Sequence, residues 1–195
     1  KISTNSATSE LKDMQTVTSD TLAYIEKMKK LGNKYLIGQT TGFEALDKKT
    51  TGFNEGDLVI IAARPAMGKT ALVLNMALKN VERGKGVIFF SLEMPAEQLM
   101  LRMLAAKTSI PLQNLRKGDM DDKEWSNLSA AFDDLNSKKL FVDDGGSINI
   151  NQLRARVRKL AQIQQNNISL VVIDYLQLMQ GLGNKDRHQE VSDIS

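Results

Sequence analysis

The sequence contains no cysteine, and this absence alone excludes several classes of protein. Without thiols the chain cannot form disulfides, a thiolate zinc site or a cysteine nucleophile. No apolar run approaches the length of a membrane span, and the residues from Lys1 onward lack the hydrophobic core of a signal peptide. We therefore expect a soluble, cytoplasmic protein that has no membrane partner.

Other residue types are scarce, and the charge is nearly balanced. The chain has one histidine, one tryptophan and three prolines, and its formal net charge of +3 is too small to indicate a nucleic-acid partner by itself. Hydrophobic residues make up 42% of the 195 residues, which suffices for a sizeable core in one domain with some appendage. The first residue is Lys rather than Met, so we expect a fragment of a longer protein.

A phosphate-binding loop is predicted directly after the apolar run 58–62, which we expect to be the first core strand. A helical pattern follows the loop, and strand, loop and helix in this order are the context that such a loop requires. Backbone N–H groups would bind the phosphates, Lys69 would add a charge for the β- and γ-phosphates, and the Thr70 hydroxyl can ligate Mg²⁺. The alternative is a helix N-terminus that merely reads Gly-Lys-Thr. The predicted ATP-binding residues are Ala63, Arg64, Pro65, Ala66, Met67, Gly68, Lys69, Thr70 and Ala71.

Two further apolar runs end in an acidic residue. Residues 168–174 end in Asp174, and residues 87–93 end in Glu93. At the carboxyl end of a buried parallel strand, Asp174 could hold the Mg²⁺ shell and Glu93 could polarise the water that attacks the γ-phosphate. The alternative for either acid is a solvated strand end or a helix cap. The sequence thus predicts catalytic roles for Glu93 and Lys69, and metal ligation by Thr70 and Asp174.

The chain divides into a linker, residues 1–37, and a nucleotide-binding domain, residues 38–195. The small polar residues 1 to about 16 indicate a mobile segment, and Thr18-Ser19-Asp20 offers N-caps for an amphipathic helix. This helix would dock on its own domain or on a neighbouring subunit. Its apolar stripe consists of Leu22, Ile25, Met28 and Leu31.

Strands that alternate with helices predict an α/β fold with a mostly parallel sheet and helices on both faces. Residues 139–144 form a third short strand, and a basic amphipathic helix follows from about residue 151. Its arginines favour a solvated face over a nucleic-acid site. The expected core positions of the helices between the second and third strands are Leu99, Met103, Leu104, Leu112, Leu115, Trp125, Leu128, Phe132 and Leu135.

Several segments resemble the bacterial replicative DNA helicases of the DnaB family. The resemblance runs from about residue 17 to the end, and family members also accept a small residue at the Ala63 position. The segments that carry it are Thr40-Thr41-Gly42-Phe43 with Leu46-Asp47, Ala62 to Thr70, Phe90-Ser91-Leu92-Glu93-Met94, Ile173 to Met179, and Gln189 to Ser195.

The resemblance implies a RecA-like P-loop NTPase assembled as a homo-hexameric ring. Such a motor moves along single-stranded DNA, unwinds duplex at the replication fork with Mg-ATP hydrolysis, and works with a primase and a helicase loader. By position it implies Lys69 and Thr70 on phosphate and Mg²⁺, Asp174 on the metal shell, and Glu93 as the water-orienting acid. Residues 1–37 would be the linker that docks on the next subunit.

The sequence stops before segments with which the family continues. These are a further core strand, basic finger residues for the neighbouring ATP site and a DNA-binding loop. We therefore expect a motor domain that is incomplete at its C-terminus, no pairing between residues 58–62 and the Asp174 strand, and poor activity of the isolated fragment.

Within the sequence, Lys185 and Arg187 are the candidate DNA-binding residues. They lie in a glycine-containing segment, 181–187, where they could reach phosphates, although an ordinary surface loop would have the same sequence. Two other functions stay open at this point: a RecA-type recombination or repair ATPase, and a nucleotide-binding interaction module.

Overall fold

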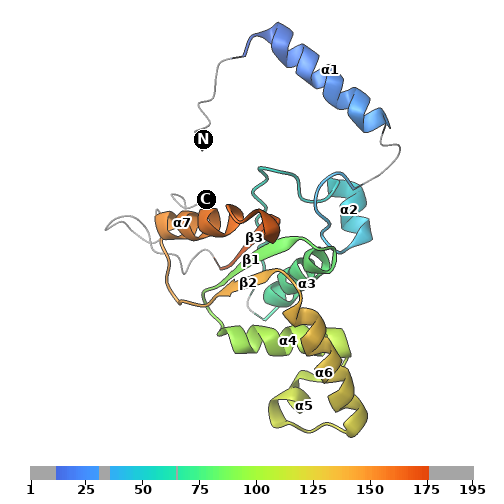
Figure 1. The fold of residues 1–195 in the computed structure, drawn as a ribbon, viewed down its shortest axis with the longest axis vertical. Helices are drawn as coiled ribbons and strands as arrows, with labels where there is room; N and C mark the ends of the chain where they lie inside the picture. Colours follow the sequence, from blue (N-terminus) through green and yellow to red (C-terminus); the bar gives the residue numbers. More distant parts are fainter. Residues whose placement is uncertain (1–11, 31–35, 65, 176–195) are drawn as a thin grey trace. The chain divides into compact units, whose positions relative to one another are not determined.

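In the computed structural model, residues 12–30, 36–64 and 66–175 are described. The chain separates into two units, residues 1–35 and 36–195, and each is considered by itself (Figure 1). No helix among the described residues combines the length and the apolar character needed to cross a membrane.

The described residues of the first unit form one helix, α1 (Met14–Lys30), so the predicted helix exists but begins earlier than expected. The Thr18-Ser19-Asp20 cap was wrong because Asp13 accepts a hydrogen bond from the backbone N–H of Thr16 at 2.7 Å and starts the helix there. Residues 14–16, assigned to a mobile segment, are therefore helical. No residue of α1 is buried, and Leu22 and Ile25 of the predicted apolar stripe are exposed.

The second unit is built on three parallel strands in the order β2-β1-β3. The strands are β1 (Gly86–Ser91), β2 (Leu140–Asp143) and β3 (Ile168–Asp174), and they confirm three of the predicted runs. Every residue of the central strand β1 is buried, as expected for a strand with a neighbour on each side. In the register of β1 and β3, Ser91 pairs with Asp174.

Helices cover both faces of this sheet (Figure 1), which confirms the predicted fold class. Val87 and Phe89 point to the face covered by α3, α4, α5 and α6, while Ile88 and Phe90 point to the face covered by α7. Within 36–64 and 66–175, the helices are α2 (Glu44–Thr50), α3 (Lys69–Glu82), α4 (Ala96–Thr108), α5 (Leu112–Lys117), α6 (Asp122–Asn136) and α7 (Ile150–Ala161), with a short 3₁₀ helix η1 (Gln164–Asn166).

The predicted first core strand, residues 58–62, is not a strand in the structure. Leu58, Val59 and Ile60 are 67%, 51% and 62% exposed, and this segment makes no ladder with any described residue. A strand is stabilised by hydrogen bonds to a neighbour, and an apolar sequence cannot replace that neighbour.

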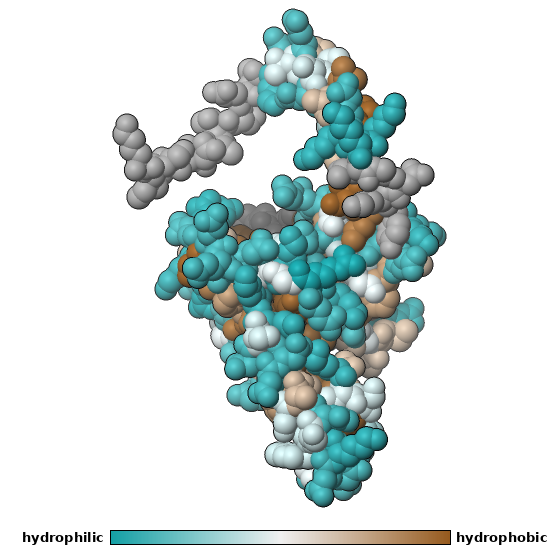
Figure 2. Space-filling model, turned by 45° about the vertical axis from the view of Figure 1, so that its right-hand side comes forward, coloured by the Kyte–Doolittle hydropathy of each residue, from teal (hydrophilic) through white to brown (hydrophobic). Residues whose placement is uncertain are grey.

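Two aromatic residues expected in the core lie on the surface instead. Trp125 and Phe132 are 60% and 45% exposed, because the buried stripe of α6 is centred on Leu128, Ala131 and Leu135. Leu112 is half-buried, whereas Leu99, Met103, Leu104 and Leu115 are buried as predicted. Some hydrophobic residues are thus exposed on a surface that is otherwise mainly hydrophilic (Figure 2).

A buried polar cluster joins the segment before α2 to the middle of α3. The Asp47 carboxylate accepts hydrogen bonds from the hydroxyls of Thr40 and Thr41 and from the backbone N–H of Thr41. Asn80 of α3 donates to the carbonyl of Thr40 at 2.8 Å, and its side chain is fully buried. The cluster therefore holds the chain around Thr40 against α3, whose first turn carries Lys69 and Thr70.

Replacing Asp47 by alanine should lower the free energy of unfolding by about 3 kcal/mol, because two hydroxyls and a buried N–H lose a charged acceptor. Chemical denaturation measures this change, and Asp133→Ala, at an exposed position of α6, is the matched control. Burial acts to raise the pKa of Asp47, but hydrogen bonds from Thr40 and Thr41 outweigh it and place the pKa below the ordinary 3.8.

The pH dependence of this contribution follows from that direction. Because the folded-state pKa is the lower one, the contribution is complete above pH 3.8 and is lost as the pH falls through the folded-state value. The difference in stability between the wild type and Asp47→Ala should therefore shrink only below pH 3.8. A variant as stable as the Asp133→Ala control at neutral pH would contradict this account.

Candidate nucleotide-binding site

The predicted phosphate-binding loop leads directly into the first turn of α3. Gly68 has a left-handed backbone with φ of 85°, and a Cβ there would meet no atom within 4 Å. The helix begins without a side-chain cap and without an acidic residue in its first turn. Its first backbone N–H groups therefore keep their capacity to donate to an anion. The described residues of the loop are mostly exposed, Met67 by 73%, and Pro65 lies outside the described residues.

Asp174 lies beside the start of α3, at the carboxyl end of β3. Thr70 Oγ1 donates a hydrogen bond of 2.6 Å to Asp174 Oδ2, and Lys69 Nζ forms an ion pair of 3.3 Å with Asp174 Oδ1. The Asp174 side chain is only 7% exposed, so it is not a solvated strand end. The structure thus brings the adjacent residues Lys69 and Thr70 together with Asp174, which lies 104 residues beyond Thr70 in the sequence.

Glu93 lies at the same edge of the sheet, just past the end of β1. The backbone N–H of Leu92 donates to the carbonyl of Asp174 at 2.9 Å, which ties the segment before Glu93 to the end of β3. The Ser91 hydroxyl donates to the carbonyl of Met94 at 2.6 Å and closes the turn that carries Glu93.

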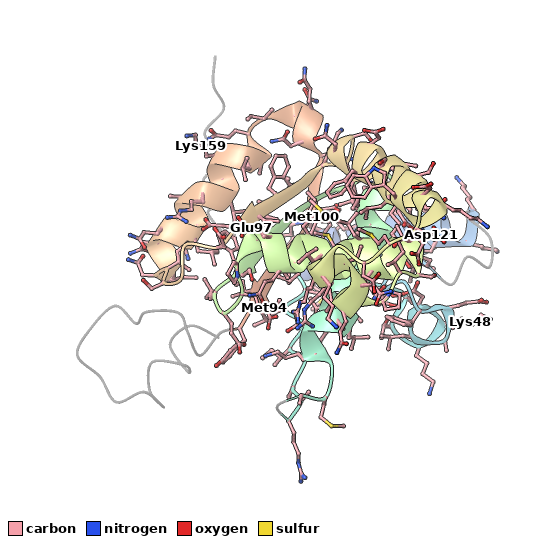
Figure 3. The ribbon with its side chains drawn as sticks, turned by 90° about the horizontal axis from the view of Figure 1, so that it is seen from below. Lys48, Met94, Glu97, Met100, Asp121 and Lys159 are labelled. Carbon is pink, nitrogen blue, oxygen red and sulfur yellow. The ribbon has the colours of Figure 1, made fainter. Side chains whose placement is uncertain are left out.

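The Glu93 side chain is exposed and makes no hydrogen bond or ion pair with a described residue. It does not cap α4, because the backbone N–H of Ala96 at the start of that helix is bound by the Asp144 carboxylate at 2.9 Å. Met94 and Glu97 mark this end of α4 in Figure 3. Glu93 is thus a carboxylate open to solvent, on the segment that directly follows β1.

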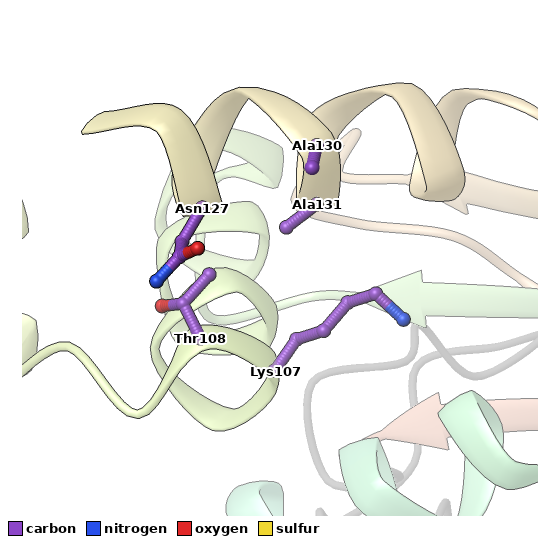
Figure 4. A pocket seen from close by; sticks show the side chains of 5 residues that line it. All are labelled: Lys107, Thr108, Asn127, Ala130 and Ala131. Atoms are coloured by element: carbon purple, nitrogen blue, oxygen red, sulfur yellow. The ribbon is translucent and has the colours of Figure 1, made fainter. Parts of the chain in front are cut away.

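A cavity of about 320 Å³ lies elsewhere, between α4 and α6, and it is lined by Lys107, Thr108, Asn127, Ala130 and Ala131 (Figure 4). Its charged residue, Lys107, is already paired with Asp134 at 2.8 Å. None of its lining residues belongs to the loop or to the two acids. We therefore assign no role in nucleotide binding to this cavity.

One residue of this region was not predicted from the sequence. The Lys69 ammonium lies over the ring of Tyr175, 4.2 Å from the ring centroid. Tyr175 directly follows Asp174, but an aromatic residue after a strand carries no signal of its own that could have singled it out. The candidate DNA-binding residues Lys185 and Arg187 lie outside the described residues.

A parallel sheet between helices, with a glycine-lysine-threonine loop at its carboxyl edge and an acid on a neighbouring strand, defines a RecA-like P-loop NTPase domain. A family model described as the DnaB-like helicase C terminal domain matches residues 38–195. The chain therefore belongs to this family of replicative helicases.

Individual relatives agree with this assignment. The chain is 44% identical over 185 residues to the replicative DNA helicase DnaB of Helicobacter pylori, which covers 94% of the chain and 38% of the relative. It is 43% identical over 194 residues to the replicative DNA helicase DnaC of Bacillus subtilis, covering 97% of the chain and 41% of the relative. The chain thus spans about two fifths of the length of these relatives.

Solved structures share the fold. The chain superposes on a solved ATPase domain with a TM-score of 0.82 at 28% identity, covering 90% of this chain and 63% of that one. It superposes with a TM-score of 0.80, also at 28% identity, on a DnaB-like replicative helicase solved in a study of its interactions with primase. That match covers 90% of this chain and 42% of the other.

Proposed function

We propose that this chain is part of an ATP-driven replicative DNA helicase motor that translocates on single-stranded DNA and unwinds duplex at the replication fork. The observation that supports this most is the convergence of Lys69 and Thr70 on the Asp174 carboxylate, at the uncapped start of α3. These are the groups that bind and polarise a nucleoside triphosphate in P-loop enzymes. A RecA-type recombinase would use the same core, but the family match favours the helicase.

The nucleotide phosphates would bind to the backbone of residues 66–71, with the Lys69 ammonium on the β- and γ-phosphates. The Thr70 hydroxyl and the Asp174 carboxylate are oxygen donors of the kind that Mg²⁺ prefers, and they already lie 2.6 Å apart. Bound Mg²⁺ would neutralise charge that develops on the phosphates. The residues present therefore suit both ATP and Mg²⁺.

Glu93 would accept a proton from the attacking water or orient that water. Its carboxylate is exposed to solvent, whereas Asp174 is buried and engaged by two partners. The two acids therefore differ in what they can do: Asp174 suits a fixed place in the metal shell, and Glu93 is free to bind water.

The partners follow from the proposed activity. They are single-stranded and forked DNA, other copies of the protein in a homo-hexameric ring, a helicase loader, and a primase, since one structural neighbour was studied for its interactions with primase. We propose that the linker helix α1, whose apolar stripe includes Leu22, Ile25 and Met28, packs against the next subunit, as the resemblance to the DnaB family implies. A replicative helicase acts on the bacterial chromosome, so we propose a cytoplasmic location.

The proposal is tested by ATP-dependent unwinding of a forked duplex by the protein that carries this sequence, compared with its Lys69→Ala variant. We expect unwinding by the wild type, none by the variant, and none by the wild type without ATP. ATP-dependent strand exchange without unwinding would instead identify a recombinase.

Removing the charges of Lys185 and Arg187 by a double alanine substitution should weaken binding to single-stranded DNA. If both side chains contact phosphates, the slope of log K against log salt should become less steep by about 1.4. Fluorescence anisotropy over a range of salt concentrations measures both effects. The control is the double variant Lys117→Ala and Lys123→Ala, at exposed positions. Equal binding by the two double variants would make 181–187 an ordinary surface loop.

A further inference from the structure

Tyr175 contributes to the ligand-free arrangement of Lys69. The Lys69 ammonium is held from two sides, by Asp174 Oδ1 at 3.3 Å and by the face of the Tyr175 ring, whose centroid is 4.2 Å away. A cation at this distance from an aromatic face is attracted by the negative charge density of the ring. The Lys69 side chain is 27% exposed and Tyr175 is half-buried, so water weakens this attraction only in part.

This arrangement competes with the one that a nucleotide requires. In the proposed function, Lys69 binds phosphates, while Thr70 and Asp174 bind Mg²⁺. In the structure, Lys69 and Thr70 instead occupy the two oxygens of the Asp174 carboxylate. A bound nucleotide must therefore withdraw the ammonium from both the carboxylate and the ring.

We propose that Tyr175 is a positioning residue that holds Lys69 against Asp174 in the nucleotide-free site and thereby weakens nucleotide binding. The proposal rests on the proposed function, since it assumes that Lys69 moves to the phosphates. Only the ring face is required, because the Tyr175 hydroxyl makes no hydrogen bond to any described residue. Phenylalanine should therefore replace tyrosine without effect.

Removing the Tyr175 ring removes its contact with the Lys69 ammonium. In the proposal, this contact exists in the nucleotide-free site and is lost when the nucleotide binds. An exposed to partly buried cation–π contact corresponds to a factor of about two to five in an equilibrium constant. Tyr175→Leu should therefore bind Mg-ADP about two- to fivefold more tightly than the wild type. Tyr175→Phe should bind like the wild type.

A series of fluorinated phenylalanines at position 175 separates this effect from a change in packing. One, two or three ring fluorines progressively remove charge density from the ring face while changing its size little. The dissociation constant for Mg-ADP, measured by calorimetry on the full chain, should fall with each fluorine and approach that of Tyr175→Leu. A flat series, or weaker binding with each fluorine, would overturn the proposal. Because the series conserves the ring, it does not depend on whether Tyr175→Leu folds.

A second measurement tests the contact without nucleotide. The ring current of Tyr175 should shift the side-chain methylene protons of Lys69 upfield in the NMR spectrum of the ligand-free protein. The shift should be kept in Tyr175→Phe, and it should be absent in Tyr175→Leu and after saturation with Mg-ADP. Unshifted Lys69 signals in the ligand-free wild type would show that the contact is not formed and would overturn the proposal.

The two levels of the hypothesis fail in different ways. If the wild type binds Mg-ADP, and Lys69→Ala does not, but the fluorine series is flat, only the role of Tyr175 is wrong. If the wild type does not bind Mg-ADP, the proposed function fails and the role of Tyr175 fails with it.

Discussion

Replacing Lys69 by alanine should lower the affinity for ATP by about ten- to a hundredfold and reduce turnover by a further factor of about 10²–10³, as expected when a charged donor to the phosphates is lost. The effect should be this large because Lys69 begins α3, where its ammonium supplements the backbone N–H groups of an uncapped helix start. Calorimetry with ATP and a phosphate-release assay measure the two effects separately.

The control is Lys79→Ala, on the same helix. Lys79 is an exposed lysine that forms a surface ion pair with Glu82 at 2.9 Å, and such pairs contribute little to stability. Lys79→Ala should bind and hydrolyse ATP like the wild type. Thermal unfolding of both variants checks that they are folded, since Lys69→Ala also loses its ion pair with Asp174. Unimpaired binding and turnover by a folded Lys69→Ala would exclude Lys69 from the site.

The three strands of the sheet could be predicted because each is a short apolar run that has a neighbour to pair with. Residues 58–62 have the same apolar character but no pairing partner among the described residues, and they form no strand. Apolar composition reports what a segment can bury. Whether the segment becomes a strand also depends on a second segment that can pair with it. The apolar residues of the segment alone do not show whether such a partner is present.

The errors on helices have local causes. The apolar residues of α6 cover a wider part of the helix surface than the face that is buried. Trp125 and Phe132 lie at the edge of this apolar stripe and are exposed. For α1, three polar residues in a row looked like the start, yet a single aspartate further upstream, Asp13, provides the cap. In both cases several residues satisfied the pattern, and packing or one hydrogen bond selected among them.

The candidate site was largely accessible from the sequence because its members sit where chain geometry is predictable. Parallel strands end at the same edge, so acids that close two such runs had to lie near each other. The contact between Lys69 and Tyr175 was not accessible, since it depends on the direction of one side chain after the end of β3. The roles of Lys69, Thr70, Glu93 and Asp174 remain predictions. Substitution of Glu93 best separates an effect on ATP binding from an effect on ATP hydrolysis.

Replacing Glu93 by glutamine should leave ATP binding within about twofold of the wild type and lower turnover by about 10²–10⁴, the usual contribution of a general base. Glutamine keeps the size of the side chain but cannot accept a proton. The turn that carries residue 93 is fixed by the hydrogen bond from Ser91 to the Met94 carbonyl and by that from Leu92 to Asp174, so the substitution should not move it.

The matched control is Glu97→Gln, an exposed glutamate in the first turn of α4 (Figure 3), which should turn over ATP at the wild-type rate. Single-turnover hydrolysis isolates the chemical step, and calorimetry gives the affinity. Lys69→Ala should lose both binding and turnover, whereas Glu93→Gln should lose turnover alone. If Glu93→Gln hydrolyses ATP as fast as Glu97→Gln, the attacking water is activated by another group. The exposed Glu93 carboxylate would then have no part in the reaction.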